Sequence, residues 1–191
     1  SFYNGYANIT VDGQKYFYID KKGKEFDQIP LSSKEEVKKW AFIDKKGNII
    51  IKASFANIGK FSEGVADVQD GETKKWKYID KLGNVVLEIN YDDAFSFSDG
   101  LAKVTLNNKS GYIDKKGKLV IDFIYQNAAF FNDKIAAVEV NNKWGFIDIN
   151  GKTLIEAKFD FAEGFSDNLA VVLENKKWGY IDKTGKYVIQ P

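Results

Sequence analysis

Short runs in which apolar and polar side chains alternate recur along this chain. The clearest copy is 144–151, WGFIDING, where an aromatic-rich strand ends at an Asp and a Gly follows three residues later. Alternation with a period of two is typical of a β-strand that uses both faces. An Asp side chain accepts hydrogen bonds from turn N–H groups, and Gly adopts positive φ without a steric penalty. Each copy therefore predicts a β-hairpin closed by a type I turn and a Gly bulge.

This hairpin occurs six times, and its spacing is nearly constant. The six turn aspartates are Asp20, Asp44, Asp80, Asp114, Asp148 and Asp182. Positions Trp76, Ser110, Trp144 and Trp178 follow one another at intervals of 34 residues, whereas the step from Trp40 to Trp76 is 36. Regular self-similarity of this length indicates a tandem array whose units shelter one another's apolar faces.

A third apolar strand precedes the aromatic strand in each unit. The segment 97–104, FSDGLAKV, has relatives at 61–68, 131–138 and 165–172, and a degraded copy at 2–9. The predicted fold class is therefore all-β: tandem three-stranded antiparallel β-meander repeats, stacked into an open curved or superhelical array. A closed propeller-like ring is the alternative, although propeller blades usually have four strands and the pattern gives three.

The repeats predict a single domain over 1–191. The approximate units are 1–23 (partial), 24–47 (short and atypical), 48–83, 84–117, 118–151, 152–185 and 186–191 (partial). In the short unit, 32–39 is either a degraded strand or a short helix that opens with a capping box. The absence of Met, and ends that fall inside units, predict that the chain is a fragment of a longer protein or a processed one.

The combined motif is Lys-Trp-Gly-[Tyr/Phe]-Ile-Asp-x-x-Gly-Lys, with Phe-Ser-x-Gly-Leu-Ala-x-Val upstream. It resembles the bacterial WG-repeat family over almost the whole chain. The dipeptide is intact at 144–145 and 178–179; the replacements are Phe17, Ala41 and Lys77 for the Gly and Ser110 for one Trp. These departures indicate a packing preference and not a chemical requirement. The resemblance implies a bacterial β-repeat protein without a shared catalytic site.

The composition argues against catalysis. The chain has no His and no Cys, so the usual nucleophilic triads and zinc sites lack their main ingredients. Six equivalent turn aspartates indicate a structural role, because paired catalytic carboxylates need two special positions. Lysines inside the turns, as at 44–47 (DKKG), disfavour a calcium site. The sequence therefore predicts a protein that is not an enzyme and that has no metal site and no cofactor.

Charge and hydropathy reduce the range of partner classes that the sequence allows. The net charge is +1, from 28 basic residues, all of them Lys, and 27 acidic ones. Nucleic-acid binders usually show a basic excess and use Arg for base and phosphate contacts, so no nucleic-acid partner is predicted. No apolar run approaches the roughly 18 residues of a membrane span. The cellular location is left open, including export and display at a bacterial cell surface.

The four recurring Trp residues have two interpretations. One is a ladder of exposed rings that stack on sugars, and the other is a core between repeats. Burying an aromatic side chain of about 200 Å² contributes roughly 5 kcal/mol at most. A three-stranded unit needs that contribution against its neighbour, which favours the core interpretation.

Aromatic residues that do not repeat are better site candidates, because the scaffold does not require them. Phe95, Phe130 and Phe161 occupy loop positions where the other repeats carry smaller or polar residues. We predict that they form an apolar binding patch; local packing is the alternative. The predicted function is a non-catalytic WG-repeat module for protein–protein interaction. The alternatives are a module that binds cell-surface glycan or peptidoglycan and a toxin-neutralising immunity protein.

Overall fold

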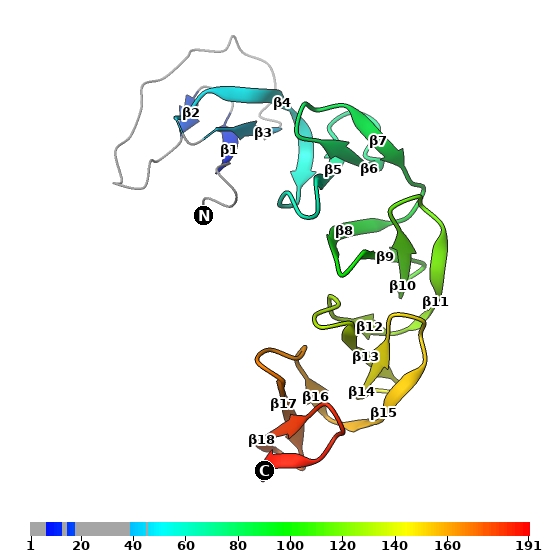
Figure 1. Cartoon of the computed structure of the whole chain (residues 1–191). Helices are drawn as coiled ribbons and strands as arrows, with labels where there is room; N and C mark the ends of the chain where they lie inside the picture. The colour runs from blue at the N-terminus through cyan, green and yellow to red at the C-terminus, as the bar shows by residue number, and fades with distance from the viewer. Residues whose placement is uncertain (1–6, 13–14, 18–38, 45) are drawn as a thin grey trace. The chain divides into compact units, whose positions relative to one another are not determined.

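The structure is a computed structural model that describes residues 7–12, 15–17, 39–44 and 46–191. The chain divides into two compact units, 1–90 and 91–191. Every regular element in the described part is a β-strand (Figure 1), which confirms the all-β prediction. The choice between helix and strand at 32–38 lies outside the described residues. The described residues include no helix of the length and apolarity that a membrane crossing requires.

The second unit consists of three separate antiparallel sheets of four strands each, none of them closed. Neighbours in sequence are neighbours in each sheet, so each is an up-and-down meander (Figure 1). The first sheet contains β8 (Asp93–Ser98), β9 (Leu101–Leu106), β10 (Lys109–Asp114) and β11 (Leu119–Tyr125). The second contains β12 (Asn127–Ala128), β13 (Ile135–Val140), β14 (Lys143–Asp148) and β15 (Thr153–Phe159). The third contains β16 (Phe161–Ala162), β17 (Leu169–Glu174), β18 (Lys177–Asp182) and β19 (Tyr187–Ile189).

The described residues of the first unit form a sheet in the order β2-β1-β3-β4-β5-β6-β7. Its central strand β4 serves two repeats: Phe55 pairs with Trp40 of β3 and also with Asp70 of β5. Two meanders therefore share one strand. The strands are β1 (Ala7–Asp12), β2 (Lys15–Phe17), β3 (Lys39–Ile43), β4 (Ile49–Ile58), β5 (Val65–Asp70), β6 (Trp76–Asp80) and β7 (Val85–Glu88).

Each sheet of the second unit has one strand more than the meander predicted from the sequence. The additional strand comes from the aromatic-rich connection, which pairs with the next strand as soon as the previous sheet ends. Only Gln126 separates β11 from β12, and only Asp160 separates β15 from β16. A four-stranded antiparallel sheet of this kind is the unit that β-propellers repeat.

The Asp-x-x-Gly turns have the predicted geometry in all five described copies. In the turn at 148–152, the Asp148 carboxylate accepts hydrogen bonds from the backbone N–H groups of Asn150 and Lys152, both at 2.9 Å. The N–H of Gly151 donates to the carbonyl oxygen of Asp148, and Gly151 has φ of 81°. The structural role of these aspartates is confirmed. The predicted turn at 20–23 lies outside the described residues.

The core lies between successive sheets. One cluster of buried side chains joins the first and second sheets of the second unit, including Tyr112, Ile121, Phe131 and Ile147. Within each unit, an outer strand also packs on the turn of the next repeat. An ideal Cβ on Gly151 would lie 3.4 Å from Ile121. Equivalent contacts join Ile51 to Gly83 and Ile155 to Gly185. The predicted mutual shelter of the repeats is therefore visible within each unit.

Candidate functional site

A β-bulge positions the first predicted site residue, Phe95. Strand β8 pairs with β9 through Ala94–Val104 and Phe97–Ala102, so two residues of β8, Phe95 and Ser96, lie opposite the single residue Lys103. Bulges of this kind redirect a side chain from the regular alternation of the strand. The Lys103 Nζ atom lies 4.1 Å from the centroid of the Phe95 ring.

Phe130, which follows β12, meets the same lysine. Its ring lies 6.1 Å from that of Phe95 in an edge-to-face arrangement, and Lys103 Nζ is 5.9 Å from its centroid. Phe130 is 48% exposed and Phe95 is half-buried. The structure thus brings two of the three predicted residues together around a cation. We call Phe95, Lys103 and Phe130 the lysine–aromatic patch.

The surroundings of Lys103 destabilise its charged form relative to the neutral amine. Burial lowers the pKa of the ammonium group, and the nearby carboxylate of Asp93 partly offsets this effect. Cations over aromatic faces gain roughly 0.5–2 kcal/mol, with the larger values where water is excluded. A partner that presents a carboxylate to this lysine would restore the charge stabilisation that burial has removed.

Phe161, the third predicted residue, has its ring contacts elsewhere. It is 36% exposed and lies between two indoles, with ring centroids 5.5 Å from Trp144 and 6.0 Å from Trp178. The prediction that it contributes to a binding surface stays a prediction.

The recurring Trp residues are mainly core. Trp76 is 8% exposed and Trp144 is 9% exposed, and Trp144 pairs across the sheet with Phe159. Trp178 differs, since it is 56% exposed. Strand β19 pairs with β18 at Tyr180 and Ile181, and the cross-strand partner of Trp178 is Leu173 of β17. The core interpretation is confirmed for Trp76 and Trp144, Trp40 is partly buried against the core cluster of the first unit, and the interpretation is wrong for Trp178.

Sequence reasoning missed Lys103, although a signal was present. Lys103 occupies a repeat position that holds Asp67, Ala137 and Val171 in the other copies, and its neighbour Phe95 is equally variable. A search for cross-strand pairs in which both members depart from the repeat would have found them. In the described part of the chain, no three His, Cys, Asp or Glu side chains gather closely enough to hold a metal ion.

These strands define a class of protein, a tandem-repeat β protein whose second unit consists of four-stranded sheets like propeller blades. The model of the WG containing repeat matches residues 40–76, 78–109, 111–144, 144–178 and 178–191. The chain therefore belongs to the WG-repeat family. No curated protein matches the sequence.

Among solved structures, Hsv2 of Kluyveromyces lactis is similar, with a TM-score of 0.53 at 8% sequence identity. The match covers 95% of this chain and 62% of the Hsv2 chain. PorZ, a bacterial surface component of the type-IX secretion system of Porphyromonas gingivalis, gives 0.46 at 10% identity over 96% of this chain and 26% of its own. A protein of unknown function from Bacteroides caccae gives 0.39 at 12% identity over 98% of this chain and 93% of its own. At such low identity, the likeness to Hsv2 concerns the fold alone.

Proposed function

We propose that this WG-repeat chain is a non-catalytic protein-binding module and that the lysine–aromatic patch is its contact surface. The observation that carries the proposal is the exposed ring of Phe130 beside a half-buried lysine, at positions the repeat does not specify. Binding hot spots are enriched in aromatic and cationic side chains set in partly desolvated surroundings.

The charge of Lys103 selects the partner chemistry. A ligand segment with an apolar side chain next to an Asp or Glu would cover Phe130 and place a carboxylate near the lysine. Such pairing of a desolvated cation with a carboxylate contributes more than the same contact in open water. An acidic–apolar peptide segment is therefore the expected partner epitope.

A peptide-display selection on the chain, counter-selected against the Phe130→Ala variant, tests the proposal. The enriched peptides should carry Asp or Glu next to an apolar residue. Their affinity should fall by about tenfold or more in Phe95→Ala and in Lys103→Met, a loss of roughly 1.4 kcal/mol.

The matched control is Ile124→Ala, which removes a 60% exposed aliphatic side chain from the same unit. It should leave binding unchanged. If the enriched peptides bind Phe95→Ala, Lys103→Met and the parent chain equally, with all three melting alike, the patch is not the contact surface.

A further inference from the structure

A cavity of about 460 Å³ opens in the first unit beside strand β6. Its lining comes from the β5–β6 turn, the start of β6 and the segment that leaves β7. The lining residues are Asp70, Thr73, Lys75, Trp76, Lys77, Glu88, Ile89 and Asn90. This volume lies within the range of small-molecule sites, roughly 300–1,000 Å³.

The first cause of the cavity is the side chain at position 77. Three other repeats carry Gly there, because the outer strand passes close by. A Cβ on Gly145 would lie 2.6 Å from the carbonyl oxygen of Ile155, and a Cβ on Gly111 would lie 2.8 Å from that of Ile121.

Opposite these glycines the outer strand carries extra residues that form a β-bulge. Between the pairs Trp144–Phe159 and Phe146–Ile155, three residues of β15 face Gly145 alone. Between β6 and β7 Lys77 pairs directly with Glu88 and no extra residues face it, whereas in the same unit three residues of β4 face Ala41. After β7 the Ile89 N–H donates to Trp76 O at 3.4 Å, so the chain passes Lys77 without the extra residues that cover the Gly in the other repeats, and the cavity lies at this place.

The second cause is a longer turn. In the second unit, β9–β10, β13–β14 and β17–β18 are joined by two-residue turns, as at Asn107 and Asn108 with φ of 51° and 60°. The turn between β5 and β6 spans 71–75. Its Gly71 donates a hydrogen bond to Ser54 O at 3.1 Å, which holds the longer turn against β4. The extra residues account for the 36-residue step from Trp40 to Trp76.

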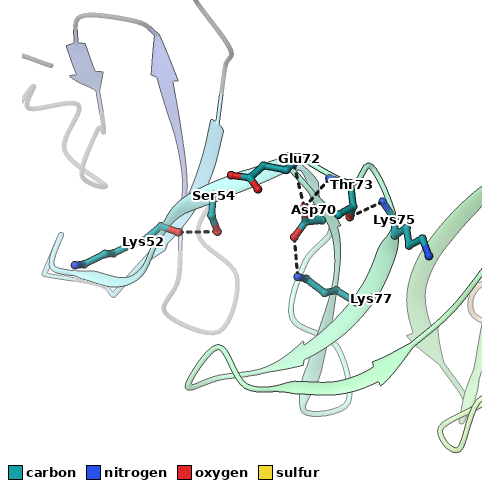
Figure 2. A network of polar contacts seen from close by, with 7 residues as sticks. All are labelled: Lys52, Ser54, Asp70, Glu72, Thr73, Lys75 and Lys77. Atoms are coloured by element: carbon teal, nitrogen blue, oxygen red, sulfur yellow. Dashed lines mark hydrogen bonds and ion pairs between the residues drawn. The ribbon is translucent and has the colours of Figure 1, made fainter. Parts of the chain in front are cut away.

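The polar groups of this wall are held in place (Figure 2). The Asp70 carboxylate accepts hydrogen bonds from the N–H groups of Glu72 and Thr73 at 3.0 and 2.9 Å, and it pairs with Lys77 Nζ at 2.9 Å. These donors hold the pKa of Asp70 well below its usual range, with the Thr73 N–H as the largest cause. Because these polar groups are already ordered, the entropic cost of ordering the site when a ligand binds is smaller.

Both members of the Asp70–Lys77 pair depart from the repeat. The equivalents of Asp70 are Leu106, Val140 and Glu174, and those of Lys77 in the second unit are glycines. Stacking of repeats needs neither residue. The longer turn, the cation and its carboxylate occur together in one copy only among the four described from β5 onward, as expected of a site and not of scaffold.

We propose that this cavity binds a neutral saccharide of one or two sugar rings. Its two carboxylates and two lysines cancel in formal charge, so an ionic ligand gains no net attraction. Carboxylate, ammonium, amide and hydroxyl groups supply acceptors and donors for sugar hydroxyls. Trp76 and Ile89 line the cavity but are each only 8% exposed, so they contribute a small apolar area and the polar groups supply most of the contact with a sugar. This site goes beyond the proposed protein-binding function and shares no residue with it.

Titration calorimetry of the intact chain with maltose, cellobiose, lactose and chitobiose tests the assignment. At least one disaccharide should bind with a dissociation constant in the millimolar range or below. Asp70→Asn should weaken that binding by about tenfold, because it releases Lys77 and removes an acceptor. Lys77→Gly restores the residue of the other repeats, so it should keep the fold, let the outer strand close over the space and abolish binding.

The matched control is Asp160→Asn, which breaks the exposed Asp160–Lys143 ion pair in the second unit. It should leave saccharide binding unchanged, and so should Phe130→Ala. Three outcomes would overturn the proposal: none of the four disaccharides binds, Lys77→Gly binds them like the parent chain, or N-acetyl-lysine amide binds more tightly than all of them. Failure here would leave the peptide selection on the lysine–aromatic patch unaffected.

Discussion

The Gly of the Trp-Gly dipeptide is expected to be a steric requirement, and Gly145→Ala tests this most sharply. An added Cβ would lie 2.6 Å from Ile155 O, 2.7 Å from Ala157 N and 2.9 Å from Ala157 Cα. All three neighbours are backbone atoms, so no side-chain rotation relieves the overlap. The outer strand must move instead, and overpacking of this kind costs about 1–3 kcal/mol.

The expected loss is finite, because Ala41 occupies the equivalent position in β3 fully buried, and β4 pairs with β3 in the same register as the outer strand of a Gly repeat. For a unit of this size, a change of 1 kcal/mol shifts the melting temperature by roughly 4–8 °C. A central value of about 2 kcal/mol therefore predicts a drop of about 10 °C. Differential scanning calorimetry, checked by urea unfolding, measures it.

The control is Gly164→Ala in the same unit. The nearest atom to its added Cβ is Phe130 O at 4.0 Å, so the substitution should change stability by less than about 0.5 kcal/mol. If Gly145→Ala and Gly164→Ala have the same melting temperature, the close approach of the outer strand is not the reason why position 145 is a Gly.

Three further outcomes are expected. Ile121→Ala should destabilise the chain by about 2–4 kcal/mol in urea unfolding, because Ile121 is 4% exposed and packs on the next turn, whereas Val120→Ala, at 37% exposure, should cost far less. Ser98→Ala should cost about 1 kcal/mol, because its hydroxyl donates a 2.6 Å hydrogen bond to Phe131 O of the next repeat; an unchanged urea midpoint would contradict this. Hydrogen bonds lower the pKa values of Asp44, Asp80 and Asp182 below 3.8, so the stability they contribute is present above that pH and is lost as pH falls through their folded values; a melting temperature that stays flat down to pH 2 would contradict it.

Much of the fold was predictable because its signals are local. The Asp-x-x-Gly turns and the alternating strands each lie within about ten residues, where periodicity and turn chemistry are informative. The fourth strand of the second and third sheets was not predictable in this way, since β12 and β16 are two residues long, unlike the six-residue β8, and carry no periodicity of their own. They form because the next strand offers a free edge to the passing chain.

The candidate site was also only partly predictable from local signals in the sequence. Phe95 and Phe130 could be selected from the sequence because they depart from the repeat. The role of Lys103 could not, because its contact with Phe95 depends on the β-bulge that places Lys103 opposite Phe95. The cavity had a signal in the sequence: the 36-residue step and the Lys in place of Gly at position 77. Its meaning depends on the path of the outer strand, which is a property of the folded sheet.

The central claim is that the fold buries the indoles of Trp76 and Trp144, which therefore serve as core, and leaves the indole of Trp178 exposed. Fluorine NMR of the chain labelled with fluorotryptophan measures this directly, through the shift of each resonance between light and heavy water, with assignments from single Trp→Phe variants. Trp76 and Trp144 should show little solvent shift, and Trp178 should show a large one. Equally large shifts at Trp76, Trp144 and Trp178 would contradict the account.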